Sequence, residues 1–219
     1  MFPKSTNAGA LALLAAPIVV IAAVLIQPTL SGDASTQVTA LTSHHQAMIA
    51  GLTLSITALV LLIAGTLWLA LALAPRAPRL ALAGAVLGVL GALVVLFENS
   101  VDAAAPAIAS GLGPAQATAI LERVHSGAIA AAEPLALLGG IGVALLGVAA
   151  LKAGAPRWAA AAIAVGALGQ VAGFATSTKA LVIASFAILF AGLLPAIRAL
   201  RTPSRPHPAA EPAPAAAVS

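Results

Sequence analysis

Long uninterrupted runs of apolar residues, separated by short polar connections, extend along the chain from residue 9 to residue 200. Each run holds about twenty residues, the length that an α-helix needs to cross ~30 Å of hydrocarbon. The runs are continuous in Ala, Leu, Val, Ile and Gly, whereas membrane strands alternate apolar and polar residues. The pattern predicts an all-α, polytopic transmembrane bundle with spans at about 9–27, 48–74, 80–97, 127–151, 157–175 and 180–200.

The composition supports a membrane protein and excludes several kinds of site. Hydrophobic residues make up 61% of the chain and charged residues only 7%, whereas a soluble domain carries roughly a quarter charged residues. The chain has no cysteine, which excludes disulfides, thiolate metal sites, iron–sulfur clusters and cysteine nucleophiles. The expected partner is the lipid bilayer, and the net charge of +4 is not interpreted as nucleic-acid binding.

The distribution of basic residues predicts the orientation of the spans. Cytosolic connections of membrane proteins are enriched in Lys and Arg. Arg123 and Lys179 lie on one side, and the other eight of the ten basic residues lie on the opposite side. That second side is therefore expected to be cytosolic, with both termini there and the protein in the plasma membrane. The eight residues are Lys4, Arg76, Arg79, Lys152, Arg157, Arg198, Arg201 and Arg205.

The two ends of the chain differ in character. The first apolar run contains Pro17 and is not followed by a small-x-small cleavage site, so we expect a retained helix in place of a cleaved signal peptide. Residues 1–201 then form one transmembrane domain. Residues 202–219 are rich in Pro and Ala without apolar periodicity, which predicts a disordered cytosolic tail.

Internal similarity predicts three pseudo-repeated helical hairpins. Pro78-Arg79 matches Pro156-Arg157, and Gly88-x-Leu90-Gly91 matches Gly166-x-Leu168-Gly169 without a gap. The connection 37–41 also resembles 116–120. With a slippage of one residue, these matches make His45, His125 and Lys179 equivalent, at the outer ends of three spans. Parallel repeats of this kind are related by an axis along the membrane normal.

Local signals predict short outer helices before the spans 48–74 and 127–151. Gly113-Pro114 places a proline at a helix start, and Ser43 with Gln46 has the spacing of a capping box. The pairs Gly84-x-x-x-Gly88 and Gly169-x-x-x-Gly173 predict close helix packing within the chain.

Ionisable and polar residues near the outer ends of the spans define a candidate ligand site. Glu133 follows His125 by eight residues on the same helix face, about 12 Å further along the helix. A carboxylate at that depth is costly and usually faces the bundle interior. Ser55 and two neighbouring threonines would extend a polar lining. The candidate residues are His45, His125, Glu133, Lys179, Glu98, Asp102 and Gln170.

Three interpretations of these residues remain open. They could be solvated groups at the membrane interface, or they could line an outward-facing pocket for a small ligand or cation. The third is a haem or transition-metal site that uses His45 and His125, since imidazole with carboxylate suits zinc, copper or iron. No cofactor is predicted, because no local ligand motif such as His-Glu-x-x-His is present.

No motif supports an enzyme. The chain contains no Gly-x-Ser-x-Gly, and Gly111-Leu112-Gly113 lacks the glycine spacing of a phosphate loop. The function favoured is therefore non-enzymatic: a small-ligand-binding, transport or sensing component. The alternatives are a metal- or haem-binding redox protein and a structural subunit of a membrane complex.

Three features of the sequence resemble those of a known group of proteins. They are the Pro-Arg starts of the spans 80–97 and 157–175, the Gly88-x-Leu90-Gly91 core, and the outer segments before His45 and His125. The chain resembles a group of alanine-rich, six-helix integral membrane proteins of actinobacteria with a domain of unknown function. The resemblance covers about residues 8–200 and implies a six-helix membrane fold. It implies no activity and no functional residues.

Overall fold

The computed structural model describes residues 5–28 and 34–201, and within them the side chains of residues 5–6, 104–110, 128–129 and 132–133 are not described. The tail predicted to be disordered, 202–219, lies outside the described residues. The described part forms helices and no strands: α1 (Ser5–Ile26), α2 (Ala34–Ser43), α3 (His45–Leu73), α4 (Pro78–Gly111), α5 (Pro114–Val124), the π-helical turn η1 (His125–Ile129), α6 (Ala130–Lys152), α7 (Arg157–Ala175) and α8 (Lys179–Arg201).

Six of these helices are long and apolar enough to cross a membrane: α1, α3, α4, α6, α7 and α8. They lie close to the six predicted spans, so the predicted membrane class is confirmed. Large apolar side chains point outward from them; Leu11, Leu71 and Leu82 are each about two-thirds exposed or more. In water such surfaces would aggregate, whereas in a bilayer they face lipid. The chain is a multi-pass membrane protein.

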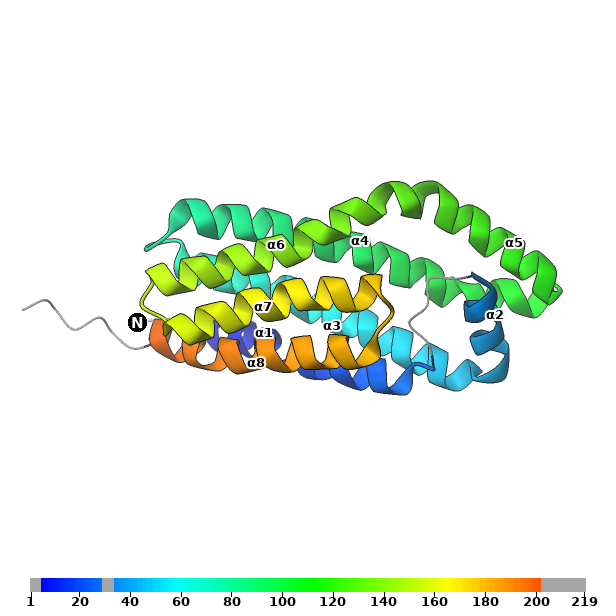
Figure 1. Cartoon of the computed structure of the whole chain (residues 1–219), viewed down its shortest axis with the longest axis horizontal. Coiled ribbons are helices and arrows are strands. Elements are labelled where there is room, and N and C mark those ends of the chain that lie inside the picture. Colours follow the sequence, from blue (N-terminus) through cyan, green and yellow to red (C-terminus); the bar gives the residue numbers. More distant parts are fainter. Residues whose placement is uncertain (1–4, 29–33, 202–219) are drawn as a thin grey trace, which may run out of the picture.

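The six long helices run lengthwise along one bundle (Figure 1), and their contacts with one another close a ring. Three pairs pack most extensively, namely α1 with α3, α4 with α6, and α7 with α8. Contacts of α3 with α4, α6 with α7, and α8 with α1 complete the ring. Three pseudo-repeated hairpins would give this order, and so would six unrelated helices joined in sequence by short turns. The repeat therefore stays a prediction.

Glycines bring the paired helices together at backbone distance. In the α4–α6 pair, a Cβ atom on Gly142 would overlap the backbone of Gly88, and one on Gly84 would lie 2.9 Å from the carbonyl oxygen of Gly142. In the α7–α8 pair, Gly169 faces Ser185 and Gly173 faces Val182. Both predicted glycine pairs therefore pack within the chain, as expected where lipid removes the hydrophobic drive between helices.

The two ends of the bundle differ. One end, which we call the basic end, carries the α3–α4 and α6–α7 connections and the last turn of α8. At this end Gly154 adopts φ +97°, and the amide of Ala155 donates to the carbonyl of Ala150, so a left-handed glycine terminates α6. Arg76 Nη1 donates to the carbonyl oxygen of Ala153 at 3.2 Å and joins the two connections.

At the opposite end, α2 and α5 lie across the ends of the long helices (Figure 1); we call this pair the cap. The cap has its own small core of Val38, Leu41, Ala117 and Leu121. Both short outer helices predicted from the sequence are therefore present. Pro114 begins α5 with Gly113 as its N-cap, as predicted.

Two local predictions need correction. The residue that caps α3 is His44, with no side-chain hydrogen bond, so the predicted capping box of Ser43 and Gln46 is wrong. The reason is that Ser43 is the last residue of α2 and has no free helix start to cap. The helix predicted over 80–97 also continues well past its apolar part, to Gly111, for 34 residues in all.

Candidate functional site

A cavity of about 680 Å³ lies inside the bundle, between the middle of the long helices and the cap. A volume of this size is typical of sites for small molecules. Its floor, the part of the lining of α4 and α6 nearest the basic end, is formed by Gly88 and Val143. Its walls are mostly apolar and include Leu59, Leu62, Val95, Leu137, Val171, Phe174 and Phe186.

Polar side chains line the upper part of the cavity from six segments of the chain. Gln27, Gln37 and Ser55 come from the end of α1, from α2 and from α3. Glu98, Asn99 and Asp102 are contributed by α4, and Gln170 and Ser177 by α7 and the turn that follows it. The apolar sequence thus encloses a site with a few convergent polar groups, the usual composition of a ligand pocket.

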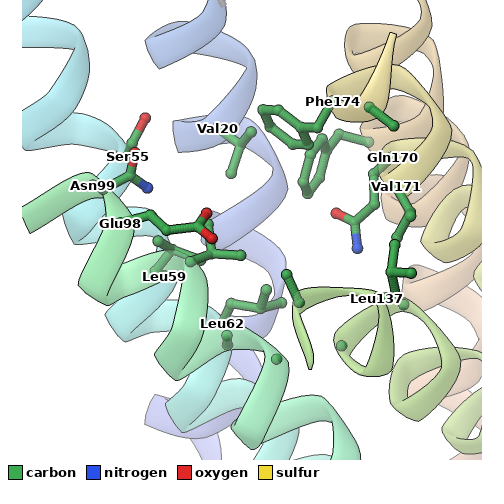
Figure 2. A pocket seen from close by; sticks show the side chains of 18 of the residues that line it. Val20, Ser55, Leu59, Leu62, Glu98, Asn99, Leu137, Gln170, Val171 and Phe174 are labelled. Carbon is green, nitrogen blue, oxygen red and sulfur yellow. The ribbon is translucent and has the colours of Figure 1, made fainter. Parts of the chain in front are cut away.

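Glu98 and Gln170 face the cavity from opposite sides (Figure 2). The carboxylate of Glu98 extends from α4, next to Asn99, and the amide of Gln170 extends from α7 below the ring of Phe174. Both residues were predicted to belong to a site. The long helix α4 places Glu98 deep enough to be half-buried, although Glu98 follows the last residue of the predicted span.

Asp102 lies one helical turn beyond Glu98 and pairs with His125. The Nε2 atom of His125 is 3.0 Å from Oδ1 of Asp102, and the two side chains are 19% and 22% exposed. His125 begins η1, in which Gly127 departs from helical geometry (φ −96°, ψ −110°) and makes a kink. The pair therefore connects the junction between the cap and α6 to helix α4. Two of the predicted site residues, His125 and Asp102, are thus in contact.

Lys179, another of the predicted site residues, contacts the end of α1 and does not line the cavity. Its Nζ donates a hydrogen bond to the backbone carbonyl of Gln27, just past the end of α1. The last carbonyls of a helix lack intrahelical partners, and a cation there also interacts favourably with the helix dipole. Gln27 is buried, and its Nε2 donates to Ser55 Oγ at 3.5 Å. Lys179 therefore joins α8 to the end of α1 through the backbone of Gln27, a residue that lines the cavity.

His45 does not join these groups. It is the first residue of α3, as His125 and Lys179 are the first residues of η1 and α8, so the three occupy matching positions at helix starts. The side chains of His44 and His45 are nevertheless exposed, and neither lines the cavity. The side chain of Glu133 lies outside the described residues; the next residue, Pro134, lines the cavity.

No metal centre is evident in the described part of the chain. Among those residues, no three or more His, Cys, Asp or Glu side chains gather closely enough to hold a metal ion. His125 uses its Nε2 on Asp102, and the exposed His45 is not placed with it. The geometry therefore gives no support to the predicted alternative of a metal or haem site at His45 and His125.

Several residues of the cavity escaped the sequence interpretation. Gln27, Asn99 and Ser177 were not singled out, and their only signal is a polar residue close to the end of an apolar run. Gln37 was noted only as part of the repeated connection 37–41. Ser55 was expected in the lining and is found there. Its neighbours Thr53 and Thr57 instead donate to carbonyls of their own helix at 2.8 Å and are exposed, as hydroxyls in apolar helices commonly do.

The charge of the site follows from its lining. Among the described residues that line it, the charged side chains are the two carboxylates, Glu98 and Asp102, and none is Lys, Arg or His. The cavity is therefore suited to a small molecule with apolar surface and a polar or positive group. No protein-family model matches the chain, and comparisons with curated proteins and with solved structures find no match.

Proposed function

We propose that this multi-pass membrane protein binds a small ligand in the cavity, as the binding element of a transport or sensing component. The observation that carries the proposal is the 680 Å³ space with apolar walls and a polar upper lining. A bundle that served only as a scaffold would be expected to fill its interior at crystal-like density. Polar groups are costly within a bilayer unless they are paired or serve a purpose.

The proposal includes the orientation of the protein in the plasma membrane. The basic end of the bundle carries six Arg and Lys residues: Arg76, Arg79, Lys152, Arg157, Arg198 and Arg201. Basic connections favour the cytosolic side, so the cap faces outward and the ligand enters from outside. The resemblance to actinobacterial six-helix proteins supports the membrane fold and adds no activity.

Cysteine labelling tests whether water reaches the cavity. The chain has no cysteine, so a single introduced thiol is the only one that can react. Gln170→Cys places the thiol in the cavity, and Leu168→Cys places it two residues away on the lipid-facing side of α7, where Leu168 is 50% exposed. The reagents are water-soluble methanethiosulfonates, one cationic (trimethylammonioethyl) and one anionic (sulfonatoethyl), applied to intact cells.

We expect the thiol of the Gln170→Cys variant to react with at least one of the reagents and that of Leu168→Cys to react with neither. The thiolate is the reactive form, and it forms only where water reaches the sulfur. If the cavity thiol stays unmodified both in intact cells and in opened membranes, the cavity is closed to water and the proposed function is wrong. Reaction only in opened membranes would instead reverse the orientation.

A further inference from the structure

The charged residues that line the cavity indicate which charge its ligand has. Glu98 and Asp102 are the charged residues of the described lining, and both lie on the same face of α4, four residues apart. Asp102 has its partner in His125, 3.0 Å away. The Glu98 carboxylate extends into the space between α4 and α7. The described lining therefore contains acidic side chains and no basic ones.

An acidic lining favours a cation over an anion. Charge–charge interactions are several times stronger inside a protein than in water because the effective dielectric constant is lower. An anion would meet the carboxylates without any basic side chain in the described lining to offset them. Gln170 and Asn99 offer amide oxygens as further acceptors for a donor such as an ammonium group.

The remaining walls favour an organic cation over a bare metal ion or a hydrophilic cation. Most of the lining is apolar, and on the α7 and α8 side it includes the rings of Phe174 and Phe186. In Figure 2, Phe174 lies directly above Gln170, with Val171 and Leu137 on the same side of the space. Aromatic faces attract organic cations, and the aliphatic side chains can bury an apolar body.

We propose that the ligand is an organic cation with an apolar body, an amine or a quaternary ammonium compound. Its charged group lies between Glu98 and Gln170, and its apolar body packs against Phe174, Val171 and Leu137. This inference rests on the proposed function, because it assigns a ligand class to the same cavity.

The charge selectivity of the thiol in the Gln170→Cys variant tests the inference. For each of the two methanethiosulfonates, the reaction rate of this cavity thiol is divided by the reagent's rate with a small thiol in solution. We expect the normalised rate to be at least about fivefold higher for the cationic reagent. Adding Glu98→Gln should bring the ratio close to one. Adding Glu122→Gln, which removes the same charge from an exposed position on α5, should leave it unchanged.

A second variant and a bound probe guard against misfolding of Glu98→Gln. Asn99→Asp adds a carboxylate to the lining with almost no change of shape, and it should raise the ratio further. Tetraphenylphosphonium should protect the cavity thiol saturably, whereas tetraphenylborate, an anion of the same shape, should not. Val95→Trp, which fills the cavity, should abolish that protection, whereas Val86→Trp, at an exposed position of α4, should retain it.

The outcomes separate the two proposals. A normalised ratio at or below one, or protection by the borate without protection by the phosphonium, overturns the assignment of a cation and leaves a ligand cavity. Failure of both reagents to reach the cavity thiol overturns the proposed function itself. A ratio that Glu98→Gln and Glu122→Gln lower equally would show a general surface field, and it would overturn the role given to Glu98.

Discussion

A side-chain pair, His125 with Asp102, connects the junction after α5 to the long helix α4. Asp102 projects from α4 beyond the floor and middle of the cavity, and His125 occupies the first position after α5. A hydrogen bond to a charged group contributes about 1.5–3 kcal/mol when well buried. Partial exposure of both side chains lowers this value by solvent screening.

We expect His125→Ala and Asp102→Ala each to lower the free energy of unfolding by about 1 kcal/mol, with the double variant losing little more. The two residues act through one contact, so either substitution removes it. Unfolding of the purified protein in detergent measures the three values. The matched control is His45→Ala, which removes an exposed imidazole and should change stability by less than about 0.5 kcal/mol. Fully additive losses would show that the pair contributes no coupling.

Pairs of helices are held by close approach at glycine, most tightly between α4 and α6. Gly142 of α6 lies against Gly88 and Gly84 of α4, and Gly91 lies against Gly139 further along the same seam. Backbone atoms cannot rotate away as side chains can. An added methyl group must therefore push the helices apart, and the dispersion contacts along the seam weaken with that separation.

Gly142→Ala should lower the free energy of unfolding by about 1–3 kcal/mol, the usual cost of overpacking a tight core. Thermal unfolding in a mild detergent measures the change. Gly111→Ala serves as the control, because a Cβ on this last residue of α4 would meet no atom within 4 Å. Its stability should stay the same or rise slightly, since alanine favours a helix. Equal stability of both variants would contradict the importance of the seam.

The sequence predicted the six spans because an apolar run of about twenty residues has few alternatives to a membrane helix. It did not predict the length of α4, whose continuation over 98–111 contains charged and small polar residues. Such a composition is equally typical of a loop. Helix α4 also contacts α2 and α5, and such tertiary contacts are not contained in local propensity.

The candidate site was predicted in part, and the reason lies in the geometry of helices. Matching helix starts fix the depth of His45, His125 and Lys179, but the direction of a side chain turns by ~100° with each residue. The alignment of His45 with His125 needed a slippage of one residue. The π-helical turn at His125 changes the rotation again. The depth could therefore be read from the sequence, whereas the directions could not.

At the scale of the whole molecule, the arrangement of charge predicts how the bundle crosses the membrane. The basic connections gather at one end, and the cap with the cavity lies at the other. Orientation in the membrane is set mainly by Lys and Arg in short connections. The proposed entry of the ligand from outside depends on this orientation.

Two single-cysteine variants test the orientation. Ser126→Cys lies at the exposed junction of the cap with α6, and Pro75→Cys lies at an exposed position between α3 and α4. A membrane-impermeant maleimide should modify the Ser126→Cys variant in intact cells and the Pro75→Cys variant only after the cells are opened. The parent chain has no cysteine and gives the background. The reverse pattern would place the cap in the cytosol.

Along α4 and α6 the lining of the cavity extends toward the basic end only as far as Gly88 and Val143. Past that floor, Gly84 and Leu146 continue the contact of α4 with α6. A solute held beside Glu98 would still have this helix contact between it and the basic end. Sensing needs no further movement, whereas translocation would require the α4–α6 seam to part. A disulfide that locks this seam would leave occupancy intact and stop transport, which distinguishes a receptor from a carrier.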